Sequence, residues 1–187
     1  MYYSGIKKND VANGEGIRTS LFVSGCRNRC KNCFNPETWS FTYGAPFDRA
    51  VAEDILSTFN SPFIAGLTVL GGEPMEPENQ RELLPFLEEF KQKYPNKTLW
   101  LYTGNTYEEL TAGVGNHFKC TEYTARILDL VDILVDGRFE EENKSIGLRF
   151  RGSSNQRVIN MNQTRTTGSI VIWDGCRFDK HYSESTN

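Results

Sequence analysis

The sequence predicts an α/β fold, specifically an incomplete, open (βα) barrel with a mainly parallel sheet. Short apolar runs alternate with stretches of helical periodicity, which is typical of parallel strands joined by right-handed crossovers. The chain has 187 residues, whereas a closed eight-unit barrel typically needs roughly 250. We therefore expect a single domain spanning 1–187, with a core at about 10–160 and a polar tail at about 177–187.

The first predicted elements lie on either side of a cysteine-rich loop. Residues 1–16 are polar and rich in turn formers, so we expect a turn that leads into a strand over 17–24. An apolar stripe predicts a helix over 48–59, with Asp48 as its N-cap. A short buried strand is then expected over 66–70.

The same alternation continues to about residue 138 and then weakens. The predicted elements are a helix over 76–94, a strand over 98–102, a helix opening at 106, a helix over 121–130, and a strand over 132–135. Pro85 is expected to kink or restart the first of these helices, and Thr106 with Glu109 has the spacing of a capping box. Short strands are expected at 157–159 and 169–173.

Three cysteines, Cys26, Cys30 and Cys33, form a C-x3-C-x2-C run directly after the first predicted strand. Thiolates are soft ligands that bind zinc or iron–sulfur clusters. A structural zinc or an ordinary 4Fe-4S cluster takes four protein ligands, whereas this loop offers three. Three thiolates around a four-iron cluster leave one iron open to a substrate. The loop follows the carboxyl end of a strand, where ligands bind in α/β folds.

A glycine-rich turn, Gly71-Gly72-Glu73-Pro74, follows the second predicted strand. On its own it reads as a strand-to-helix turn in which glycine permits tight backbone geometry. The functional alternative is a site for a ligand ammonium, which needs carbonyl or carboxylate acceptors at close range. The residues alone leave both interpretations open.

The composition excludes several classes of function. A formal charge of −3 gives no general attraction to nucleic acid or to an anionic membrane. No apolar run approaches the length of a membrane span, and the first residues lack the apolar stretch of a signal peptide. We therefore expect a cytoplasmic protein whose close-set thiols are metal ligands or catalytic groups rather than disulfides.

The cysteine spacing resembles that of the radical S-adenosylmethionine (SAM) enzymes. The surrounding residues 13–39 resemble the entry stretch of glycyl-radical activating enzymes, and residues 71–74 resemble the GGE motif of the same superfamily. Two later segments, 135–139 and 151–157, are similar to those of the activating proteins of anaerobic ribonucleoside-triphosphate reductase. The resemblance covers roughly residues 10–160.

This resemblance implies a reaction and its cofactors. Cys26, Cys30 and Cys33 would bind three irons of a 4Fe-4S cluster, and the open iron would chelate the amino and carboxylate groups of SAM. Reductive cleavage of SAM would give methionine and a 5′-deoxyadenosyl radical, which abstracts hydrogen from a glycine of the reductase. A flavodoxin- or ferredoxin-type protein would supply the electron.

The resemblance also implies where SAM is held. The glycine-rich turn would bind its amino group, and an aromatic residue near the third cysteine would meet its adenine. Asn32 occupies the usual aromatic position, and the aromatic residue here is Phe34. The candidate cofactor-binding residues are Asn32, Cys33, Phe34, Gly71, Gly72, Glu73 and Pro74. Asp136 and the stretch 149–157 are expected either to meet the SAM carboxylate, the ribose or a partner loop, or to be ordinary turn and loop.

Other charged and isolated residues have two interpretations. Arg27, Arg29 and Lys31 lie inside the cysteine loop as solvated charges, or else they offset an anionic cluster or dock an acidic electron donor. His117 and Cys120 lie in an irregular stretch and are expected to be incidental.

Two other functions compete with activation of the reductase. The first is activation of another glycyl-radical enzyme of the pyruvate formate-lyase type, against which the short chain and the late motifs argue. The second is a zinc or electron-transfer cluster protein with Cys176 as the fourth ligand. This rival predicts no SAM binding and loss of the metal site in Cys176→Ala.

Overall fold

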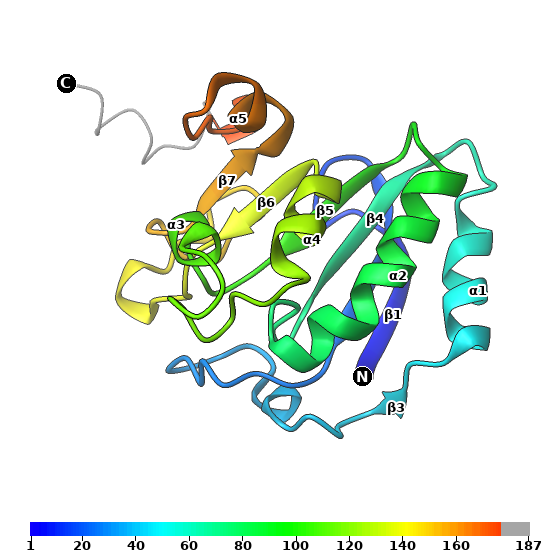
Figure 1. Cartoon of the computed structure of the whole chain (residues 1–187), viewed down its shortest axis with the longest axis horizontal. Helices are drawn as coiled ribbons and strands as arrows, with labels where there is room; N and C mark the ends of the chain where they lie inside the picture. The colour runs from blue at the N-terminus through cyan, green and yellow to red at the C-terminus, as the bar shows by residue number, and fades with distance from the viewer. Residues whose placement is uncertain (177–187) are drawn as a thin grey trace.

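The computed structural model describes residues 1–176 as an α/β fold on one seven-stranded sheet (Figure 1). The strands are β1 (Tyr2–Asp10), β2 (Ile17–Val23), β3 (Ala45–Pro46), β4 (Ile64–Gly71), β5 (Thr98–Tyr102), β6 (Ile133–Asp136) and β7 (Arg157–Asn160). The helices are α1 (Arg49–Thr58), α2 (Pro77–Lys93), α3 (Tyr107–Thr111), α4 (Thr124–Leu130) and α5 (Met161–Thr167). Three short 3-10 helices cover Pro36–Trp39, Glu141–Asn143 and Asp174–Cys176.

The strand order is β3-β1-β2-β4-β5-β6-β7, and within the described residues the sheet does not close. The four strands β2, β4, β5 and β6 are parallel, which confirms the predicted parallel core. At the edges, β1, β3 and β7 pair antiparallel with their neighbours. The sheet is therefore mixed rather than mainly parallel.

The first strand corrects the prediction of a turn over residues 1–16. Tyr2–Asp10 forms β1, whose backbone groups are satisfied by pairing with β2 and β3. Most of its side chains are half-buried or exposed, so the apolar alternation that marks a strand is missing from the sequence. The turn is confined to 11–16, where Gly14 and Gly16 have positive φ angles.

Helices α1, α2 and α4 pack on one face of the sheet and form the main core with it (Figure 1). The predicted N-cap of α1 is confirmed, since Asp48 accepts a hydrogen bond from the Val51 amide. Helix α2 runs through Pro85 as one helix, so the predicted restart does not occur. Burial of Leu83 and Leu87 against the sheet offsets the hydrogen bond that the proline removes.

The last described elements differ from the prediction of two strands. The strand at 157–159 is confirmed as β7, but 169–173 contributes only a single bridge between Ile172 and Ile159. Helix α5 lies between them and was not predicted, because its threonine-rich sequence has weak helical periodicity. Among residues 1–176, no helix is long and apolar enough to cross a bilayer.

Candidate functional site

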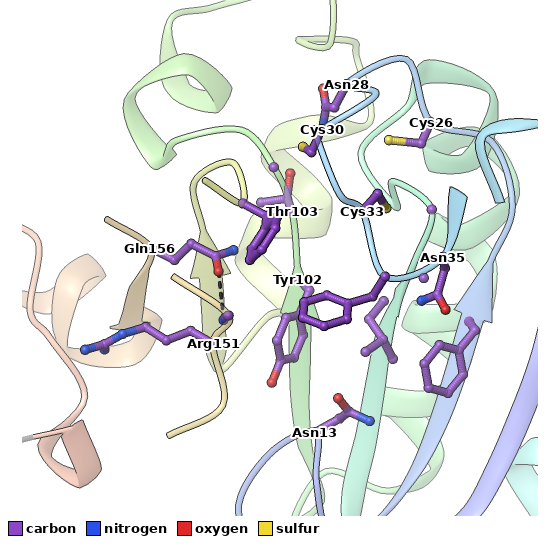
Figure 2. A pocket seen from close by; sticks show the side chains of 18 of the residues that line it. Asn13, Cys26, Asn28, Cys30, Cys33, Asn35, Tyr102, Thr103, Arg151 and Gln156 are labelled. Carbon is purple, nitrogen blue, oxygen red and sulfur yellow. Dashed lines mark hydrogen bonds between the residues drawn. The ribbon is translucent and has the colours of Figure 1, made fainter. Parts of the chain in front are cut away.

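A pocket of about 450 Å³ lies on the sheet face opposite the helices. Phe22, Leu70 and Tyr102 line it, and each follows a core residue of its strand. Successive side chains of a strand point to opposite faces, so the strands separate the pocket from the helical core. Figure 2 shows the cysteine loop at one end of the pocket and Asn13 at the other.

All three motif cysteines line this pocket, on a loop that leaves the carboxyl end of β2 (Figure 2). Cys26 is buried, and Cys30 and Cys33 are half-buried free thiols. The loop turns sharply because Arg29 and Asn32 adopt left-handed φ angles of 47° and 55°. The expected position of the loop, at the end of a parallel strand, is confirmed.

The pocket lining carries three free thiols, which are the donor type that binds iron–sulfur clusters. Among the described residues, no three His, Cys, Asp or Glu side chains gather closely enough to hold one ion. A four-iron cluster is larger, and thiols bound to different irons need not converge on one point. Trp39 also lines the pocket. Its indole nitrogen is buried and has no hydrogen-bond partner among the described residues. A bound ligand would satisfy it.

Burial governs the protonation of the thiols. It raises the pKa of Cys26 to about 11, with a further increase from the nearby Glu73 carboxylate. Burial also raises the pKa of Cys30, and the neighbouring Cys33 thiol adds to it. In the metal-free chain these two thiols are therefore protonated at neutral pH, so ligation of a metal would release protons.

Gly71 and Gly72 line the pocket at the end of β4. Gly71 has a φ of +112°, and a Cβ on it would lie 2.7 Å from the backbone nitrogen of Val23. A Cβ on Gly72 would lie 2.8 Å from the carbonyl oxygen of Gly25. The turn therefore requires glycine because β4 approaches the start of the cysteine loop closely.

Glu73 and Pro74 lie behind this lining, and both are buried. Glu73 Oε1 accepts hydrogen bonds from the Met75 amide and from Thr103 Oγ1 at 2.9 and 2.8 Å. Glu73 Oε2 accepts from Asn28 Nδ2 and the Gly104 amide, again at 2.9 and 2.8 Å. The carboxylate thus holds the cysteine loop and the end of β5 together, while the two glycines face the pocket.

The other candidate residues from the sequence also divide into those that line the pocket and those that do not. Cys33 and Phe34 line the pocket, whereas Asn32 is exposed and is not among the described residues that line it. The Phe34 ring is 66 % exposed and lies 5.3 Å from the Phe139 ring. Asp136 is buried and accepts from the Arg157 guanidinium at 2.9 Å, so it does not face the pocket.

Late loop residues complete the lining, and some of them were missed by the sequence analysis. Arg151, Gly152 and Gln156 come from the predicted 149–157 stretch and line the pocket, and Figure 2 shows Arg151 and Gln156 on one side of it. Phe139 and Leu148 also line the pocket.

Three polar residues around the Glu73 carboxylate were missed as well, and two of them, Asn28 and Thr103, line the pocket. Asn28, Thr103 and Lys119 are linked to Glu73 by hydrogen bonds or charge. The only sequence signal was positional, since Thr103 follows a parallel strand.

The remaining candidate side chains bind partners away from the pocket or lie outside the described residues. Arg27 pairs with Glu76 and Glu78, whereas the Lys31 ammonium reaches Glu142 at 3.5 Å on the surface. The Cys120 thiol donates to backbone carbonyls, in keeping with an incidental role. The side chain of Cys176 and the tail 177–187 lie outside the described residues, so the proposed fourth ligand stays a prediction.

Comparison with known proteins first gives the class. A family model described as a 4Fe-4S single cluster domain matches residues 12–159. An anaerobic ribonucleoside-triphosphate reductase-activating protein from Pasteurella multocida is 39 % identical over 165 residues, covering 87 % of this chain and 99 % of that relative.

Relatives from two other sources give the same result. A protein of the same name from Escherichia coli K12 is 36 % identical over 80 % of this chain and 92 % of its own length. Another, from Enterobacteria phage T4, is 33 % identical over 84 % of this chain and 93 % of its own length. The chain therefore belongs to the family of anaerobic ribonucleoside-triphosphate reductase-activating proteins.

Proposed function

We propose that this protein activates an anaerobic ribonucleoside-triphosphate reductase by generating a glycyl radical on it, with a 4Fe-4S cluster and SAM as cofactors. The observation that supports this most directly is one pocket lined by Cys26, Cys30, Cys33 and the Gly71-Gly72 turn. The open sheet is then an incomplete (βα) barrel of the radical SAM type, and the whole chain is one such domain. The relatives are named as activators of this reductase, which supplies the proposed partner.

Cys26, Cys30 and Cys33 would each hold one iron, which leaves the fourth iron to the pocket. When bound, the cluster would supply the one electron for reductive cleavage of SAM to methionine and 5′-deoxyadenosine, with the hydrogen atom drawn from a glycine of the reductase. The electron comes from a flavodoxin- or ferredoxin-type donor in the cytoplasm. Arg29 and Lys31 are exposed on the loop and offer positive charge to an acidic donor.

The pocket offers groups that complement the ammonium and the adenine of SAM. Backbone carbonyls at Gly71 and Gly72 are acceptors for its ammonium, because no side chain shields them. The Phe34 ring lies on the lining next to Cys33, within reach of an adenine. The Trp39 indole nitrogen is a free donor for a ring nitrogen. The aromatic side chains of Phe22, Tyr102 and Phe150 limit water around the reacting atoms.

The chemistry is tested by reconstituting the full chain with iron and sulfide under anoxia, reducing it and adding SAM. We expect 5′-deoxyadenosine and methionine in equal amounts from wild-type protein and from Cys120→Ala, and none from Cys30→Ala. A sample with an intact 4Fe-4S cluster that leaves SAM uncleaved would overturn the proposal. That outcome would favour an electron-transfer protein instead.

A further inference from the structure

We propose that Lys119 is a positioning residue that fixes the cysteine loop in shape before the cluster binds. The inference rests on the proposed function for the identity of the bound group, but its first test uses the metal-free chain. Lys119 lies in an irregular segment, 86 residues beyond the third cysteine of the motif (119 − 33). Its side chain is nevertheless fully buried.

The ammonium of Lys119 lies among three side chains of the site. Its Nζ donates to Asn28 Oδ1 at 2.8 Å and lies 3.3 Å from Glu76 Oε1 and 3.6 Å from Glu73 Oε2. The backbone of Lys119 is held as well, since its carbonyl accepts from Gln80 Nε2 at 2.7 Å. A lysine anchored at both ends is a fixed charge rather than a mobile surface group.

This charge acts on the cysteine loop through Asn28, which lies between Cys26 and Cys30. The Asn28 amide is held at both ends, because Oδ1 accepts from Lys119 and Nδ2 donates to Glu73. The preceding amide is held by the same network, since the Arg27 N–H donates to Glu76 Oε1 at 2.8 Å. Two consecutive loop residues are therefore tied to side chains that lie behind the pocket.

Charge balance favours a lysine at this place, beside the Arg27 guanidinium that also pairs with Glu76. The carboxylates of Glu73 and Glu76 are both fully buried beside the loop. Burying a carboxylate is costly unless a cation or hydrogen bonds compensate it. Without the Lys119 ammonium, the negative charge of the two carboxylates would act more strongly on the thiolates and on an anionic cluster. Lys119 thus supports both the shape of the loop and the potential around it.

The test compares amide hydrogen exchange in the metal-free full-length chain. In Lys119→Met we expect amides of 26–33 to exchange faster by on the order of tenfold, while amides of α1 keep their wild-type rates. Lys91→Met is the matched control, because Lys91 also pairs with a largely buried carboxylate, Asp132 at 2.8 Å, but at the amino ends of β5 and β6, away from the cysteine loop. In that variant, the amides of 26–33 should keep their wild-type exchange rates.

A second variant covers the case in which Lys119→Met does not fold. Asn28→Ala keeps Lys119 beside Glu73 and Glu76 but cuts the connection to the loop, so it should speed exchange at 26–33 to a similar degree. Lys119→Arg retains the cation and should restore part of the protection. Wild-type exchange at 26–33 in a folded Lys119→Met or in Asn28→Ala would overturn the inference.

The reconstituted chain gives a separate readout. Supporting side chains typically change metal affinity by on the order of 10- to 100-fold, so Lys119→Met should lose iron to a chelator faster by that factor than Lys91→Met does. Equal loss from the two variants would overturn the positioning role. If wild-type protein takes up a cluster but cleaves no SAM, the proposed function fails while the exchange result still decides the role of Lys119.

Discussion

Asn28 Nδ2 donates a hydrogen bond to Glu73 Oε2 at 2.9 Å and so joins the cysteine loop to the glycine-rich turn. Backbone contacts support the same junction, because the Glu73 amide donates to the Gly25 carbonyl at 2.9 Å and the Gly72 amide to Val23 at 2.7 Å. The two motifs therefore form one rigid unit at the ends of β2 and β4. The consequences of this junction can be measured.

Glu73→Gln should lower the free energy of unfolding by about 3 kcal/mol, since an amide nitrogen would then face buried N–H donors. The measurement is urea denaturation of the metal-free chain. Glu88→Gln is the control, because Glu88 forms a surface pair with Arg126 and should change stability by less than about 1 kcal/mol. Equal stabilities of the two variants would show that the Glu73 carboxylate does not hold the junction.

Gly71→Ala should be destabilised by about 2 kcal/mol or more, because its positive φ and its contact with Val23 leave no room for a Cβ. SAM binding to the reconstituted variant should weaken at the same time, and equilibrium dialysis measures it. Gly5→Ala is the control, since nothing lies within 4 Å of a Cβ there. Full stability in Gly71→Ala would refute the close approach of β4 to β2.

Single cysteine variants test which thiols hold the cluster. Alanine at position 26, 30 or 33 should reduce iron retained after anoxic reconstitution to background, whereas Cys120→Ala should retain it, because the Cys120 thiol is bonded to backbone carbonyls. Cys176→Ala should also retain iron, as measured by iron content per chain. Loss of iron in Cys176→Ala would support the four-cysteine rival.

Asp10 predicts a pH dependence of stability. Burial acts to raise its pKa, but hydrogen bonds from Ser20, Lys7, the Ala12 amide and Asn13 outweigh it and lower the pKa from 3.8 to about 2. The stabilisation is therefore present above pH 3.8 and is lost as pH falls toward 2, and it amounts to about 2 kcal/mol at neutral pH.

Urea denaturation at about pH 6 and about pH 3 checks this prediction. The stability gap between wild type and Asp10→Asn should narrow at the lower pH, because Asp10 is then largely protonated in the unfolded chain while it stays mostly ionised in the folded chain. Asp54→Asn is the control, since the Asp54 carboxylate forms an exposed pair with Lys8. A gap that stays constant between the two pH values would contradict the lowered pKa of Asp10.

The parallel core was predictable because its strands carry short buried apolar runs, although β2 also buries the polar residues Arg18, Thr19 and Ser20. In β4, Leu67 and Val69 face the core, and the residues between and after them face Arg18 or the pocket. The segment therefore has the sequence pattern of a buried strand. Strand β1 was not predictable, since its polar sequence becomes a strand only through pairing with β2. Likewise, α2 continues through Pro85 because of tertiary packing, and this packing cannot be predicted from local helix propensity.

The site shows the same division between local and long-range information. The three cysteines and the two glycines were predicted to share one site, and the structure gathers them around one pocket. The internal role of Glu73 was not predictable, because its partners Asn28, Thr103 and Gly104 come from distant segments. Lys119 carries no motif, and only the fold brings it to Asn28.

The most direct test of the account adds the reconstituted, reduced protein and SAM to an anaerobic ribonucleoside-triphosphate reductase under anoxia. Electron paramagnetic resonance then reports on the reductase. The account predicts a glycyl-radical signal on the reductase together with release of 5′-deoxyadenosine, and no signal with Cys30→Ala. SAM cleavage by a cluster-loaded sample without any radical on the reductase would contradict the assigned partner.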